Sequence, residues 1–240
     1  MISEAAIWGT ISVIPLIIGA WIAFRFKPSP KIVGVVMGFG AGALIAAVAY
    51  ELIPESSPRD FATFLSLGLG AVVFYLATSW VERRSRRKGK EAENAKAQTG
   101  RTILLGALLD GVPESLVLGM SIGIGDVISI AFLGAVFVSN LPESIGASSE
   151  MEAGGMQRSR VYMIWIVIML ACVLVTICGA LMIQYVPNLE GIYIKAFAAG
   201  AVLAMLADSM IPEGFKEGGR LTGLMTVMGF AFASILALVG

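Results

Sequence analysis

The sequence predicts an all-α polytopic membrane protein with eight transmembrane helices. Hydrophobic residues make up 57% of the 240 residues and charged residues only 14%, a balance that excludes an ordinary soluble domain. Windows of about 20 apolar residues, the length needed to cross a bilayer core of roughly 30 Å, recur along the chain. Most of the connections between them are short, so we expect one transmembrane domain over residues 1–240.

Eight windows can be assigned in chain order. They cover residues 5–24, 32–53, 62–81, 102–122, 127–148, 161–183, 191–213 and 221–239. The first follows "MISEAAIW", where an acidic residue stands in place of the basic ones of a signal peptide, so we do not expect a cleaved signal. The third is followed by a polar basic segment, 82–101, without apolar periodicity, which predicts a solvated cytoplasmic loop.

Positive charges predict the orientation of these spans. If the N-terminus is outside, all of the 17 basic residues except Arg59 and Lys195 lie on the inner side. Because basic residues concentrate in cytoplasmic loops, we expect both termini outside the plasma membrane. The basic run at 83–90 is then a topology signal, and contact with anionic lipid is the alternative.

Four windows carry an internal Pro-Glu with a polar residue three positions before the proline. The segments are "ELIPES" at 51–56, "DGVPES" at 110–115, "SNLPES" at 139–144 and "DSMIPEG" at 208–214. A proline frees the backbone carbonyl four residues earlier, and an ionisable side chain inside a span is costly unless it serves a pathway or a site. The repeated motif therefore indicates a polar site within the membrane.

The motifs of the fourth and fifth spans predict its ligands. Asp110 and Glu114 are four residues apart, and Asn140 and Glu143 are three apart, so each pair projects from one helical face. Asp110 and Asn140 also lie at similar depths in the membrane. We therefore expect these oxygen donors, together with Ser139, to surround one cation. Glu51 and Glu55 near the outer end, and Asp208 and Glu213 toward the inner end, would line its pathway.

The second and seventh spans resemble each other. "GALIAAVAYELIPE" at 42–55 aligns without a gap with "GAVLAMLADSMIPE" at 200–213. Since charge places the second span outward and the seventh inward, the pattern predicts an inverted repeat, as in many secondary transporters. Spans one to three would be related to spans six to eight, around spans four and five.

These motifs resemble those of the ZIP family of divalent-metal transporters, most specifically in "LLDGVPESLVLGMSIG" and "VSNLPESIGAS". The resemblance implies eight spans, a long cytoplasmic loop after the third, metal uptake into the cytosol, a transport site between spans four and five, and often a homodimer. Asp110 stands where the family has its motif histidine, Gly111 at its asparagine and Glu114 at its glutamate. In span five, Ser139, Asn140 and Glu143 take these places.

The chain departs from the family in containing no histidine. Every candidate ligand is an oxygen, which suits hard cations, although zinc also binds carboxylates tightly. We expect a single-metal site, because the sixth span carries no acid. Zinc is the first choice of transported cation by family, with manganese and ferrous iron as alternatives.

Other function classes remain open. A proton-coupled carrier of an organic substrate would also place acids in its spans, and a membrane protein that binds metal without transporting it would keep the ligands. Polar hydrogen bonds between helices are the structural alternative. The chain lacks histidine and therefore also HExxH, so we do not expect an enzyme. We also expect no resident cofactor and no nucleic-acid partner.

Overall fold

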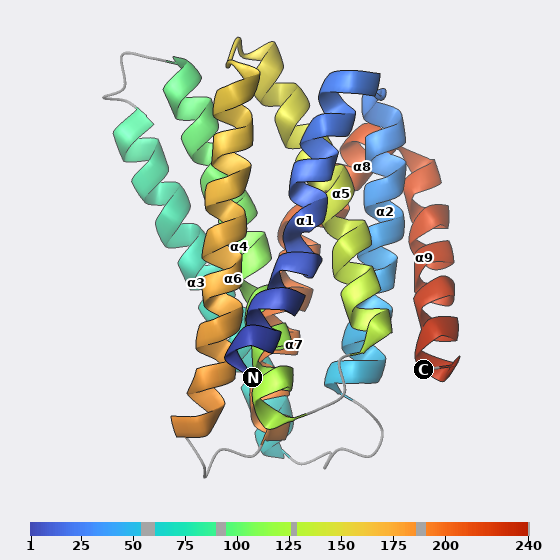
Figure 1. Ribbon diagram of the computed structural model, residues 1–240. Helices are drawn as coiled ribbons and strands as arrows, with labels where there is room; N and C mark the ends of the chain where they lie inside the picture. Colours follow the sequence, from blue (N-terminus) through green and yellow to red (C-terminus); the bar gives the residue numbers. More distant parts are fainter. Residues whose placement is uncertain (54–60, 90–94, 126–128, 186–190, 240) are drawn as a thin grey trace.

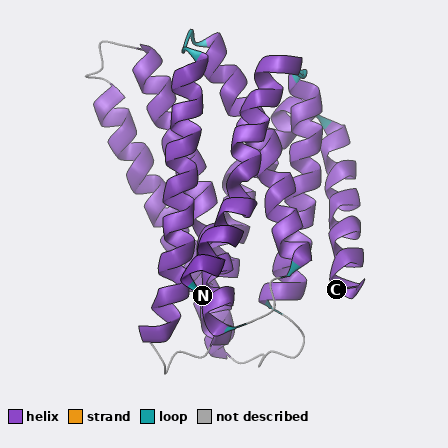
Figure 2. Ribbon diagram, viewed as in Figure 1, coloured by secondary structure: helices purple, strands orange, loops and turns teal. Residues whose placement is uncertain are grey.

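The computed structural model describes residues 1–53, 61–89, 95–125, 129–185 and 191–239 (Figure 1). Within these ranges the regular structure is helical and contains no strand (Figure 2). Eight of the described helical segments are long and apolar enough to cross a membrane, and they coincide with the eight windows found in the sequence. The predicted fold class, an all-α polytopic membrane protein, is confirmed.

The spans follow one another up and down the bundle. Their helices are α1 (Ile2–Phe26), α2 (Pro30–Ala47), α3 (Phe61–Gly89), α4 (Ala95–Ile124), α5 (Ile130–Ala153), α6 (Arg158–Tyr185), α7 (Gly191–Met205), α8 (Ile211–Gly218) and α9 (Arg220–Val239). Two π-helical turns, η1 (Val48–Leu52) after α2 and η2 (Leu206–Met210) between α7 and α8, interrupt the second and seventh spans.

Sequence signals account for how two of these helices begin. Ser29 precedes α2, and its hydroxyl accepts a hydrogen bond from the Ile32 amide at 3.4 Å, with Pro30 at the first helical position. Ser129 caps α5 in the same way, accepting from the Phe132 amide at 3.1 Å. Each cap satisfies an amide that the first turn of a helix leaves without an intrahelical partner.

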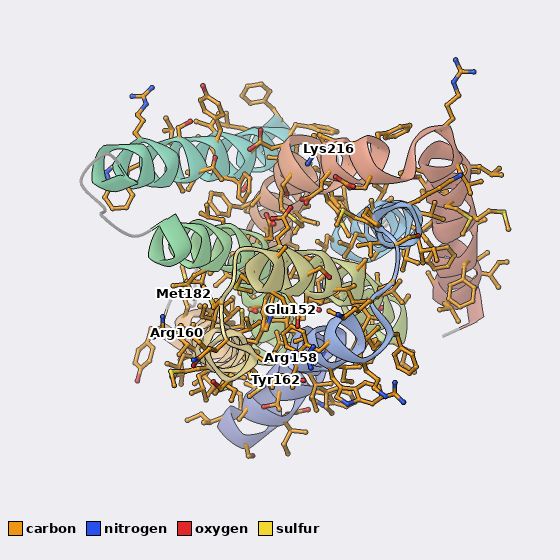
Figure 3. The ribbon with its side chains drawn as sticks, turned by 90° about the horizontal axis from the view of Figure 1, so that it is seen from above. Glu152, Arg158, Arg160, Tyr162, Met182 and Lys216 are labelled. Atoms are coloured by element: carbon orange, nitrogen blue, oxygen red, sulfur yellow. The ribbon has the colours of Figure 1, made fainter. Side chains whose placement is uncertain are left out.

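Both termini lie at the lower end of the bundle as drawn (Figure 1). The turns from α1 to α2, α5 to α6 and α8 to α9 lie at the opposite end (Figure 1). Arg158 and Arg160 in the first turn of α6 and Lys216 in the last turn of α8 therefore lie at that end too, and Figure 3 labels them. Arg158 also donates to Glu152 there, with its Nε 2.8 Å from Oε1. The described basic side chains thus gather at one end, apart from Lys195 in the first turns of α7.

The segment 82–101, expected as a solvated cytoplasmic loop, is helical in its described residues. Helix α3 continues to Gly89 and helix α4 begins at Ala95, with residues 90–94 outside the described part. The segment is rich in arginine, lysine, glutamate and alanine, which have high helix propensity. Absence of apolar periodicity marks a solvated segment, but it does not prevent a helix that has already formed from propagating.

Four pairs of helices make the most extensive packing contacts. Helix α2 packs on α9 and α7 packs on α3, while α1 packs on α5 and α6 packs on α4. Glycines allow the closest approaches: a Cβ added at Gly42 would overlap the Thr226 carbonyl oxygen, and one at Gly200 would overlap that of Leu67. These two glycines occupy the same place in the aligned segments 42–55 and 200–213. The π-turns η1 and η2 also coincide position by position in this alignment.

Two apolar clusters lie on either side of the Pro-Glu segments of α4 and α5. One is built mainly from α2, α4, α5 and α7 and includes Leu44, Leu52, Val117, Met120, Val136 and Leu206. The other is built mainly from α1, α5 and α6 and includes Leu16, Ile145, Trp165 and Ile168. Along α4 and α5, the polar residues 110–115 and 139–144 therefore fall between apolar layers.

Candidate metal site between α4 and α5

Glu114 is the most deeply buried acid of the described residues. Its side chain is only 4% exposed, and its carboxyl group lies against the hydroxyl of Ser139 on α5. Pro113, inside α4, precedes it and removes one backbone hydrogen bond from the helix. Glu114 of α4 and Ser139 of α5, two of the residues in the predicted ligand set, thus lie together.

Asp110 is one helical turn before Glu114 and has a partner on a different element. The Ser209 hydroxyl of η2 lies 3.2 Å from Asp110 Oδ1 and is placed to donate a hydrogen bond to it. The two α4 acids therefore face serines on two different spans. The sequence marked Ser209 as the polar residue three positions before Pro212, the same motif position as Asp110, but it did not place Ser209 in the site.

The polar residues of α5 turn partly toward α1. The Asn140 side-chain amide donates from Nδ2 to the Ser12 carbonyl oxygen at 3.2 Å, and the Ser144 hydroxyl lies 3.2 Å from the Pro15 carbonyl oxygen. Asn140 is 3% exposed. These two contacts fasten α5 to the backbone of α1. The sequence did not predict α1 as a partner of α5.

Glu143 on α5 lies close enough to Asp110 and Glu114 for their negative charges to repel. Even so, no group of three or more acidic or thiol side chains in the described residues is arranged to hold a metal ion. Like charges without a counter-ion are expected to stay apart. The carboxyl groups are thus in one neighbourhood without being drawn to a common point.

The buried polar side chains in the described part of the chain are all hydrogen-bonded. No buried side-chain nitrogen or oxygen of the described residues lacks a hydrogen-bond partner. Ser139 also donates to the Val136 carbonyl oxygen at 2.9 Å. A ligand that entered this region would therefore have to replace existing hydrogen bonds.

The pathway acids are only partly described. Asp208 and Glu213 are exposed, and Glu213 lines a cavity of about 110 Å³ together with Glu150 and Glu217. This cavity lies at the end of the bundle that carries the basic turns. Glu55 lies outside the described residues, and for Glu51 only the backbone, in η1, is described.

Comparison with known proteins finds one distant similarity. A candidate zinc transporter of Arabidopsis thaliana is 24% identical over 223 residues, which cover 83% of this chain and 33% of that protein. The chain thus spans about a third of the length of this relative. No protein-family model matches the chain.

Proposed function

We propose that the protein transports a divalent metal cation across the plasma membrane into the cytosol, through an oxygen-donor site between α4 and α5. The observation that supports it best is the burial of Glu114 at 4% exposure, with Glu143 and Asp110 close by. Three carboxyl groups in one membrane-embedded region are costly unless they serve a site or pathway. The similarity to a candidate zinc transporter favours zinc, with manganese and ferrous iron as alternatives.

The proposed ligand set combines charge and neutral oxygens. Asp110, Glu114 and Glu143 supply the negative charge, and the Oδ1 atom of Asn140 and the hydroxyl of Ser139 supply neutral donors. Carboxylate, amide and hydroxyl oxygens suit hard divalent cations, and zinc also accepts carboxylates. A bound cation would offset the repulsion between the acids and draw them inward. In this proposal the cation organises the site, and the protein supplies donors already in its neighbourhood.

The proposed route runs from the lower end of the bundle to the end with the basic turns. Glu51 and Glu55 would attract the cation at entry, and Asp208 and Glu213 would receive it at exit. The apolar cluster around Val117, Met120 and Val136 lies on the entry side of Glu114, while Asp208 and Glu213 are exposed on the exit side. This difference supports access from the exit side in the conformation described, with the basic end facing the cytosol.

We also propose that spans one to three and six to eight form an inverted repeat. The matched packing of α2 on α9 and α7 on α3, and the coincidence of η1 with η2, support it. If the repeat is real, Gly42→Ala and Gly200→Ala should each cost about 1–3 kcal/mol of stability. Gly68→Ala, at a position where a Cβ meets nothing within 4 Å, is the control. A marked loss of stability at Gly42 with none at Gly200 would argue against the repeat.

A homodimer stays a prediction, which mass photometry in nanodiscs would check.

The experiment that tests transport uses proteoliposomes loaded with a metal-sensitive dye. Zinc, manganese, ferrous iron, cobalt, cadmium and magnesium are compared for the wild type, for Glu114→Gln with Glu143→Gln, and for Glu4→Gln. Glu4 is a matched acidic control, since it is 54% exposed beside the N-terminal amine. We expect flux of at least one divalent cation in the wild type and the Glu4 variant, and none in the double variant.

The opposite result has a clear meaning. Absence of flux for every metal, in protein that is folded by thermal melting, would refute the proposal. Binding without flux would favour a metal-binding protein that does not transport. If the protein showed neither metal binding nor metal flux, a carrier of an organic substrate would become the favoured function.

A further inference from the structure

The π-turn η2 decides which side chains of the seventh span face α4. A π-turn places one extra residue in the helix, and such turns are frequent at functional sites. Because an α-helix advances about 100° per residue, the extra residue rotates the side chains beyond it by roughly that angle. Within η2, Asp208 is exposed while Ser209, the next residue, is half-buried against Asp110.

The Ser209 hydroxyl has two acceptors within reach. Its oxygen lies 3.2 Å from Asp110 Oδ1 and 3.0 Å from the Met205 carbonyl oxygen. A hydroxyl carries one proton and two lone pairs, so it donates to only one of these acceptors at a time. When it donates to Met205, its lone pairs are free on the side of Asp110.

Ser139 stands in the same relation to the other acid of α4. Its hydroxyl donates to the Val136 carbonyl oxygen at 2.9 Å and lies against Glu114. Each α4 acid therefore faces a serine whose proton has a backbone carbonyl as an alternative acceptor. Ser139 belongs to the predicted ligand set, and Ser209 has the same local chemistry on a different helix.

Resting on the proposed function, we propose that Ser209 is a specificity-determining oxygen contact of the cation site. With the site empty, its hydroxyl donates to Asp110. With a divalent cation on Asp110, the proton turns to the Met205 carbonyl and the Ser209 oxygen faces the cation. The seventh span then contributes directly to the site, and the position of Ser209 helps to set which cations are accepted.

A purely structural serine would have different requirements. A serine inside a helix can satisfy its hydroxyl with the carbonyl four residues earlier, as Ser234 does with Phe230 at 2.7 Å. Ser209 has that bond and, in addition, an acid from a helix 99 residues away in sequence. Ser234→Ala is therefore a matched control, because it removes the same kind of backbone bond without an acidic partner.

The test measures metal binding to the full-length chain in detergent by isothermal titration calorimetry, with zinc, manganese and cadmium as probes. Ser209→Ala should weaken zinc binding by about 10-fold, in line with the 10–100-fold typical of groups that support a metal site. Ser209→Thr, which keeps the hydroxyl, should stay within about 3-fold of the wild type on the same scale. Ser209→Cys should raise the cadmium-to-manganese affinity ratio by at least about 10-fold, because thiolate is a soft ligand.

The inference is overturned if Ser209→Ala binds zinc as tightly as Ser234→Ala, or if Ser209→Cys has the same cadmium-to-manganese ratio as Ser209→Ala. If Ser209→Ala does not fold, the comparison of the threonine and cysteine variants with the wild type decides. Failure of the proposed function gives a different pattern, since the wild type itself would then bind none of the three metals. Wild-type binding and flux with unaffected Ser209 variants would reject this inference alone.

Discussion

Helices α4 and α5 carry the same Pro-Glu motif, yet their polar side chains have different partners. On α4, Asp110 and Glu114 face the hydroxyl groups of Ser209 and Ser139. On α5, Asn140 and Ser144 contact carbonyl oxygens of the α1 backbone. The acids of α4 thus face hydroxyl groups that can rotate, whereas the polar side chains of α5 face backbone carbonyls whose direction is fixed by helix α1.

This difference suggests how the two helices divide the work of a cation site. Backbone contacts fix the position of α5 and orient the Asn140 amide, whose Nδ2 donates to the Ser12 carbonyl oxygen and whose Oδ1 is the proposed cation ligand. Hydroxyl contacts on α4 can be exchanged at little cost when a cation arrives. We therefore expect substitutions on α4 to affect mainly metal affinity and substitutions on α5 to affect stability as well.

The largest effect is expected for Asp110→Ala. Removing a carboxylate ligand should weaken metal binding by more than the roughly 10–100-fold lost when a supporting group is removed. The same change relieves repulsion among Asp110, Glu114 and Glu143, so the melting temperature without metal should stay equal or rise. Calorimetric titration and thermal melting check the two quantities. A large loss of stability without metal would show that Asp110 has a structural role, and would contradict the view that substitutions on α4 affect mainly metal affinity.

A smaller effect, on both stability and metal affinity, is expected for Asn140→Ala. The variant loses the bond to Ser12, and hydrogen bonds between membrane helices contribute about 0.6 kcal/mol on average and up to about 1.7. It also loses the proposed Oδ1 ligand, which carries no charge, so metal affinity should fall by about 10-fold, or roughly 1.4 kcal/mol. Equilibrium unfolding and calorimetry on one preparation measure both. An affinity unchanged from the wild type would remove Asn140 from the ligand set.

The eight spans were predictable because the signal is compositional. Windows of about 20 apolar residues can be recognised without knowing their neighbours. The sequence also allowed a candidate site between α4 and α5 to be proposed, since helical spacing and depth are local properties of each motif. The extension of α3 and α4 into residues 82–101 was not predictable, because apolar periodicity reports burial, whereas a charged segment with high helix propensity can extend a helix into water.

The contact between Ser209 and Asp110 could not be predicted from spacing alone. It depends on η2, and a π-turn changes which residues face a neighbour without leaving a signature in hydrophobic periodicity. The only available signal was that Ser209 shares the motif position of Asp110. The hydrogen bond from Asn140 to Ser12 was not predicted for a similar reason. Every residue carries a backbone carbonyl, so the residue type at position 12 does not mark it as an acceptor.

The smallest effect is expected for Ser144→Ala, and it isolates the structural side of the comparison. The Ser144 hydroxyl is fully buried and has two acceptors, the Pro15 carbonyl at 3.2 Å and the Leu141 carbonyl at 3.0 Å. Alanine removes the donor and leaves no buried polar atom in its place, so stability should fall by only about 0.6 kcal/mol. Metal affinity should stay equal to that of the wild type, because the hydroxyl faces α1. If affinity fell as it does for Asn140→Ala, the α1 contacts would control the site itself, and the division between a fixed α5 and an adjustable α4 would have to be abandoned.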